Sequence, residues 1–280
     1  MKENIPLVTA NSWSVLRQFT DARIALGRSG VSLPTSVHLA FQLAHAKARD
    51  AVHRSLDVPH LTQALSAAWP ELAPPCALLH SAATDRNQYL QRPDLGRKLD
   101  AASLDLLASA YPKPTQAGKK ARPYDLVFVV ADGLSALAIE QNAAPFLRAM
   151  KPRLEQSQWR VAPLCIAMQS RVAIGDEIGQ AVGAKAVVVL IGERPGLSSP
   201  DSMGLYLTWM PSVGLTDASR NCISNVRLAG LSHDEAAFKL HYLLTQARQR
   251  QLSGVALKDE ANGSALAMAD EKSNFLLRSP

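Results

Sequence analysis

Cysteines, aromatic residues and long apolar runs are scarce in this 280-residue chain, and each scarcity excludes a class of protein. The three cysteines, Cys76, Cys165 and Cys222, are too few and too scattered for a disulfide framework or a zinc site. The best apolar run, from Ala186 to Ile191, is far shorter than the roughly 20 residues that cross a bilayer. The start of the sequence, MKENIPLVTANSWS, has neither region of a secretory signal. We therefore expect a cytoplasmic protein without membrane contact.

Motifs typical of a nucleotide-cofactor site or of a set of catalytic residues are also missing. No G-x-G occurs, which removes the dinucleotide fingerprint, and there is no Walker A loop and no G-x-S-x-G elbow. His38, His45 and His53 are two helical turns apart, too far for the i, i+4 pairing that clamps one ion. The sequence therefore shows no complete catalytic set and no metal site.

The composition is that of a globular protein with a basic balance. Apolar residues make up 47% and charged residues 19%, and the net charge is +6. The basic cluster at 119–122 keeps a nucleic-acid-binding protein open as an alternative, but stacking aromatics do not accompany it. We expect this cluster to be a solvated loop.

Two regions with different patterns are separated by a basic, proline-containing segment. Before Tyr124 the apolar spacing is helical, and no strand-like alternation appears. The segment at 113–123, KPTQAGKKARP, is the predicted linker. The predicted organisation is a helical N-terminal region (1–112), this linker, and an α/β domain (124–280). Expected N-terminal helices run from 12 to 27, from 34 to 56 and from 93 to 110.

Buried runs alternate with amphipathic stretches after the linker. This alternation predicts βαβ units and a Rossmann-like parallel sheet with helices on both faces. Expected strands are 125–130, 161–168, 186–191 and 204–210, and expected helices are 135–156, 175–182 and 234–251.

Three loops leave the first three strands of this domain: 132–135, 169–172 and 192–196. Ligands of open parallel sheets bind beyond the carboxyl ends of the strands, so these loops are expected along one edge. Each also has a simpler interpretation: Asp132 or Ser135 can cap the next helix, and 192–196 can be only a turn. Their convergence favours a site for a polar ligand.

Six segments in order along about residues 12 to 250 resemble one known family, the small (light) subunit of ethanolamine ammonia-lyase. They are TDARIALGRSG (20–30), NQYLQRPDLGR (87–97), DGLS (132–135), DEIG (176–179), VLIGERPGL (189–197) and NCISN (221–225).

The resemblance implies a function shared between two chains. A large barrel subunit binds ethanolamine, and the small subunit closes over adenosylcobalamin at their junction; the products are acetaldehyde and ammonia. Family contacts to cobalamin carry over to Val172, Glu193 and Cys222. Val172 and Glu193 lie in loops that strand order selects independently. Radical chemistry of this kind belongs to the cofactor, which agrees with the missing catalytic set.

Other expectations concern the metal, the location and the alternatives. The D-x-H-x-x-G pattern of another cobalamin group is absent, so we expect no residue of this chain to ligate cobalt. The family-like body begins near residue 12, which leaves little room for a tail that directs the chain into a bacterial microcompartment; the partner would have to arrange encapsulation. A stand-alone Rossmann-like nucleotide-cofactor enzyme and a basic nucleic-acid-binding protein remain the alternatives.

Overall fold

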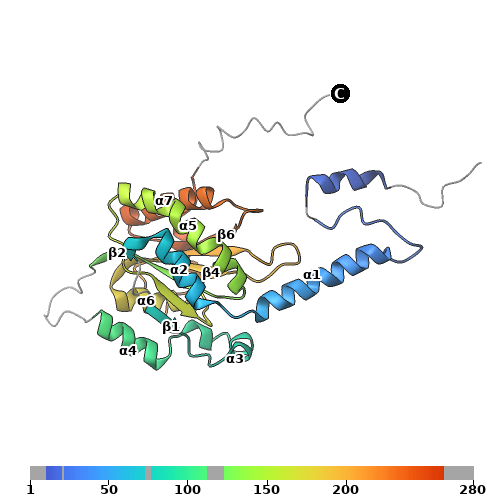
Figure 1. The fold of residues 1–280 in the computed structure, drawn as a ribbon. Coiled ribbons are helices and arrows are strands. Elements are labelled where there is room, and N and C mark those ends of the chain that lie inside the picture. Colours follow the sequence, from blue (N-terminus) through green and yellow to red (C-terminus); the bar gives the residue numbers. More distant parts are fainter. Residues whose placement is uncertain (1–10, 21, 73–76, 112–122, 262–280) are drawn as a thin grey trace, which may run out of the picture.

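The computed structural model describes residues 11–20, 22–72, 77–111 and 123–261, which include a six-stranded mixed sheet (Figure 1). In space the strands follow the order β1-β3-β2-β4-β5-β6. Their bounds are β1 (Ala77–His80), β2 (Tyr124–Ala131), β3 (Cys165–Met168), β4 (Ala184–Gly192), β5 (Met203–Trp209) and β6 (Arg220–Val226).

The α/β class is confirmed, but the sheet is not parallel throughout. β1, β3, β2 and β4 pair in parallel, whereas β5 is antiparallel to β4 and to β6. Parallel neighbours need a crossover of about a dozen or more residues, usually a helix. The connection at 193–202 is shorter and contains no helix, so the chain returns in the opposite direction. The Rossmann-like arrangement is therefore not confirmed beyond the four parallel strands.

Helices cover both faces of the sheet, as predicted. The helices of the C-terminal part agree closely with the predicted ranges. Capping side chains set the starts of two of them. The Ser135 hydroxyl accepts from the amide of Ala138, and Ser232 forms a capping box with Glu235. The helices are α1 (Thr35–His53), α2 (Val58–Ala68), α3 (Arg86–Gln91), α4 (Ala101–Ala110), α5 (Ala136–Gln156), α6 (Ile174–Val182) and α7 (His233–Arg250).

The core consists of two apolar layers on the two faces of the sheet. One layer packs α2, α5 and α7 against alternate strand residues such as Phe128 and Val188. The other packs α4 and α6 against their neighbours, Val127 and Val189. This alternation follows from the two-residue repeat of a strand. Each fully buried large side chain contributes about 1.5–3 kcal/mol.

Three expectations for the N-terminal part are wrong. A strand, β1, precedes Tyr124 and joins the sheet beside β3, so this region is not helical throughout. The helix expected from 12 to 27 is only the 3-10 helix η1 (Ser12–Gln18), because Ala25 and Gly27 have positive φ. The helix expected from 93 is split into a 3-10 turn at 95–97 and α4, since the Asp100 carboxylate caps a new helix.

The predicted linker at 113–123, including the basic cluster, lies outside the described residues except for Pro123. The division into a 1–112 region and a 124–280 domain therefore stays a prediction.

Among the described helices, none is both long and apolar enough for a membrane span.

Candidate functional site

The three loops predicted to share one edge do lie together, at the carboxyl ends of β2, β3 and β4. We call this edge, formed by residues 132–135, 169–172 and 192–196, the rim. β2 lies between β3 and β4 in the sheet, so its loop contacts both neighbours. β6 runs in the same direction as β4, because β5 is antiparallel to both, and it brings residues 225–226 to the same edge.

Asp132 ties the β2 loop to the β3 loop and does not cap the helix that follows it. Its buried carboxylate accepts hydrogen bonds from the amides of Gln169 (3.0 Å) and Ser170 (3.1 Å). Burial raises the pKa of this carboxyl, while the two amides and the guanidinium of Arg86, 3.6 Å away, act in the opposite direction. The side chain therefore fixes the backbone just before Val172.

Two arginines that contact the ring of one tyrosine form a cluster next to the rim loops. The Arg86 and Arg171 guanidinium carbons lie 4.8 and 4.4 Å from the ring centroid of Tyr89, which is fully buried. The Tyr89 hydroxyl donates to the carbonyl of Ser170 (3.0 Å). Arg86 donates to the carbonyl of Gly133 (2.8 Å), so one cluster holds both loops.

Two glycines let the β2 and β4 loops meet backbone to backbone. Gly133 has a φ of 57°, and a Cβ placed on it would lie 2.3 Å from the carbonyl oxygen of Gly192. A Cβ on Gly192 would lie 2.0 Å from the carbonyl oxygen of Ser135. The neighbouring amide of Leu134 donates to the Gly192 carbonyl at 2.9 Å. Any side chain at either glycine would force these loops apart.

Glu193, predicted as a cofactor contact, is held at the rim by one residue just before β5 and one on β6. Its Oε2 accepts a 2.5 Å hydrogen bond from the Ser202 hydroxyl and a 3.3 Å bond from the amide of Asn225. A Cβ on Gly204 would lie 2.9 Å from Glu193 Oε1, so the carboxylate lies over a position without a side chain. Oε1 has no hydrogen bond to any described residue.

Cys222, the second predicted contact, lies on the exposed part of β6 opposite Tyr206 of β5. Partial burial of the thiol, together with the nearby Glu193, raises its pKa, and a hydrogen bond with Tyr206 acts in the opposite direction. A raised pKa keeps the thiol protonated, which fits a packing contact and not a nucleophile.

Val172, the third predicted contact, is half-buried where the β3 loop turns into α6. Its carbonyl accepts from the amide of Gly175 (3.1 Å), and its side chain packs at the border of the α4–α6 layer. Glu193 and Cys222 thus share one cluster around Tyr206, whereas Val172 lies two strands away on the same edge.

One buried ion pair connects α6 to β6. Arg220, at the start of β6, donates to Asp176 in the first turn of α6 at 2.5 Å, and both side chains are almost fully buried. Burial raises the pKa of Asp176 to about 6, while Arg220 acts in the opposite direction. The pair links the helix that follows Val172 to the strand that carries Cys222.

Sequence reasoning missed most of these supporting residues. Tyr89 and Gly96 lie in the family-like segment 87–97, but their contact with the rim needs the fold to be known. Ser202 and Gly204 reach Glu193 only because β5 is antiparallel, and the short β4–β5 connection was the signal for that.

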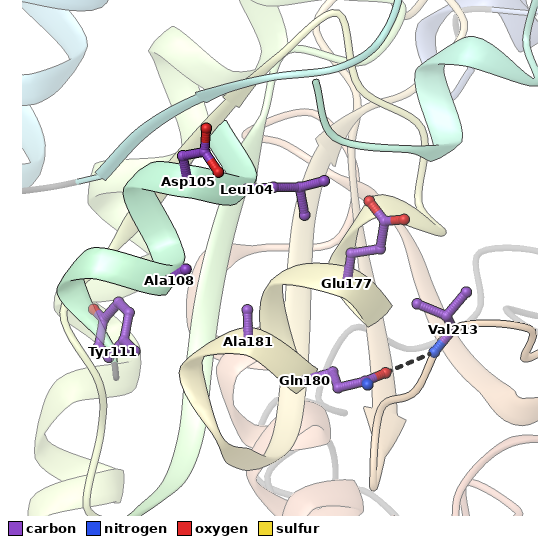
Figure 2. Close-up of a pocket in the computed structure, with 8 residues that line it drawn as sticks. All are labelled: Leu104, Asp105, Ala108, Tyr111, Glu177, Gln180, Ala181 and Val213. Atoms are coloured by element: carbon purple, nitrogen blue, oxygen red, sulfur yellow. Dashed lines mark hydrogen bonds between the residues drawn. The ribbon is translucent and has the colours of Figure 1, made fainter. Parts of the chain in front are cut away.

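A cavity of about 580 Å³ lies away from the rim, between α4 and α6 (Figure 2). Figure 2 shows Leu104, Ala108 and Ala181 facing it, with the Gln180 side chain accepting from the amide of Val213 (3.0 Å). None of the three predicted contacts lines this cavity. One of its lining residues, Tyr111, is the last described residue before the gap at 112–122. We assign this cavity no ligand.

Within the described residues, no group of three or more His, Cys, Asp or Glu side chains is arranged to hold a metal ion.

Comparison with known proteins gives a consistent result over nearly the whole chain. Residues 10–258 match the family model described as ethanolamine ammonia-lyase light chain (EutC). The chain is 56% identical to the ethanolamine ammonia-lyase small subunit of Pseudomonas fluorescens (strain Pf0-1), covering 99% of both chains. It is 54% identical to that of Ralstonia nicotianae (strain ATCC BAA-1114 / GMI1000), covering 96% of both. The chain therefore belongs to the ethanolamine ammonia-lyase light chain family.

Proposed function

We propose that this chain is the small subunit of an adenosylcobalamin-dependent ethanolamine ammonia-lyase and that its rim forms part of the cobalamin pocket at the interface with the large subunit. The reaction converts ethanolamine to acetaldehyde and ammonia. The observation that carries the proposal is the position of Glu193: an anchored carboxylate at the carboxyl edge of the sheet, beside the exposed Cys222.

The polar groups at this edge fit the periphery of a corrin. Corrin side chains are amides, which need both acceptors and donors. Glu193 Oε1 is an acceptor without a hydrogen bond in the described chain, and its partner atom Oε2 is fixed by Ser202 and Asn225. Oε1 lies over Gly204, where a side chain would come within 2.9 Å of it, so the glycine lets the carboxylate take this position. One oxygen therefore holds the side chain in place while the other remains for a ligand amide.

Val172 and Cys222 supply apolar contact on either side of Glu193. Val172 offers a half-buried aliphatic surface, and Asp132 fixes the backbone that carries it. The Cys222 thiol, held protonated by its raised pKa, adds a small uncharged surface. These residues orient the ligand and exclude water from one side of it.

Adenosylcobalamin, when bound, supplies the radical chemistry of the reaction. We propose that this chain contributes no catalytic residue and no cobalt ligand, and that the large subunit binds most of the ethanolamine. The rim cluster around Glu193 contains carboxylate, hydroxyl, thiol and amide groups, which suit the binding of amides.

Co-expression with the large subunit tests this proposal. Acetaldehyde should form from ethanolamine only when both chains and adenosylcobalamin are present. Activity of the purified single chain with a nucleotide cofactor, or steeply salt-dependent binding to DNA or RNA, would contradict it.

A further inference from the structure

The N-terminal part of the chain forms an arm with little contact to the rest of the protein. The arm comprises η1, the segment that follows it and α1, that is, the described residues 11–20 and 22–53. Figure 1 shows α1 leaving the body at one end and η1 standing apart from it. In α1 only Ala51, near its attached end, is buried, and in η1 no residue is.

Large apolar side chains are concentrated on this arm. Eight of the fifteen exposed large hydrophobic residues of the described chain lie between residues 13 and 43, so the arm exposes far more apolar surface than its length accounts for. On α1, Leu39 and Leu43 are one helical turn apart and are 61% and 56% exposed. Exposed apolar side chains concentrated in this way indicate an interaction site. The other six exposed hydrophobic residues of the arm are Trp13, Val15, Phe19, Ile24, Val31 and Leu33.

The arm is attached at the rim, not at a remote surface. The carbonyl of Val52, near the end of α1, accepts from Arg86, the same side chain that holds Gly133 and contacts Asp132. Arg54 forms an ion pair with Glu140 of α5 at 2.5 Å. Further out, Arg23 donates to the carbonyl of Leu197 (3.2 Å), just after the loop that carries Glu193. A chain that closes over the rim therefore meets the arm as well.

The charge of the arm indicates what kind of surface it binds. Residues 11–53 contain five Lys or Arg and two Asp, a net charge of +3 out of +6 for the whole chain. Two such arms would repel one another, which disfavours pairing between copies of this chain. An apolar surface bordered by acidic side chains would complement the arm in both respects.

We infer that the arm is the docking element for the large subunit, binding an apolar, acid-bordered surface of that chain with Leu39 and Leu43 near the centre of the contact. The inference rests on the proposed function. A 19-residue helix is about 28 Å long, enough to lie along a partner well beyond the rim itself. The arm thus holds the two chains together, and the rim contacts the cofactor.

The test measures association of the full-length chain with the purified large subunit by sedimentation or calorimetry. The double variant Leu39→Ser/Leu43→Ser should bind at least about tenfold more weakly than the parent. Val255→Ser is the matched control: Val255 is 80% exposed, follows α7 and lies beside the start of β6, at the end of that strand away from the rim. Its replacement should leave association unchanged. Circular dichroism establishes that the variants fold.

A second variant tests the charge of the arm. Lys47→Glu/Arg49→Glu should weaken association, and the loss should be largest at low salt. Unchanged affinity in the leucine variant would overturn the inference. So would a parent chain that dimerises alone through Leu39 and Leu43, because the occupant would then be a second copy.

Failure of the inference and failure of the proposed function give different results. If the parent pairs with the large subunit and shows cobalamin-dependent activity while both arm variants associate normally, only the role of the arm is wrong. If the parent neither associates nor supports activity, the proposed function is wrong.

Discussion

The two faces of the sheet differ in how far helices cover them. On one face α2, α5 and α7 cover strand residues from β2 through β6, including Phe128, Leu205 and Ile223. On the other face the buried residues of the α4–α6 layer end at β4. Beyond it Tyr206 is only partly buried, and Cys222 is exposed. The covered surface of both faces therefore stabilises the fold, and the open part of the second face is free for a ligand or a partner.

The largest loss of stability is expected at the buried ion pair where the covered part of the second face ends. Asp176→Leu would leave Arg220 buried without its partner and should lower the free energy of unfolding by about 3–5 kcal/mol, measured by urea denaturation. The double variant Asp176→Leu/Arg220→Met should be more stable than the single one. Equal losses in both would show that packing, and not the charge pair, sets the cost.

A core truncation on the covered face should come next. Leu147 of α5 is fully buried, so Leu147→Ala should lower the free energy of unfolding by about 3 kcal/mol. Leu78→Ala, at an exposed leucine of β1, is the matched control and should cost less than about 1 kcal/mol. If the two variants lose similar stability, the contrast between covered and open surface does not hold.

Changes on the open part should affect binding more than folding. Glu193→Gln keeps the shape of the side chain but removes its charge, and it should raise the KM for adenosylcobalamin of the assembled pair roughly five- to tenfold. Glu71→Gln, in an exposed ion pair with Lys151, is the control. An unchanged KM in the Glu193 variant would show that this residue is not part of the proposed pocket.

The smallest expected change in stability comes from replacing the two cysteines of the second face. Cys165 is buried in β3 under α4 and α6, whereas Cys222 is exposed. Cys222→Ala should change the free energy of unfolding by less than about 0.5 kcal/mol, and Cys165→Ala should cost about 1 kcal/mol. Thermal denaturation of both variants compares them; a greater loss in the Cys222 variant would contradict the assignment of its surface as open.

Local pattern predicted the C-terminal elements well, because each carries its own signal. β2 and β4 are buried apolar runs, and α5 begins at a serine that caps it. β1 was missed because its four residues, ALLH, show neither alternation nor length. β6 was missed because RNCISNV is mostly polar; only alternate residues of it, such as Ile223, face the core.

The direction of a strand and the partners of a side chain are tertiary properties. A buried run at 204–210 predicts a strand, but only the short connection before it reveals that β5 is antiparallel. The rim follows from strand order, which is why Glu193 could be placed there from sequence. Its contacts with Ser202 and Asn225 depend on β5 and β6, so periodicity could not predict them.

The close approach of Gly133 and Gly192 has a consequence for the rate of assembly. Two backbones in direct contact leave the β2 and β4 loops little conformational freedom to lose when a bulky ligand binds. The rim is thus preorganised before any ligand binds. Formation of the proposed interface pocket should then be limited by the encounter of the two chains and not by a slow rearrangement of loops.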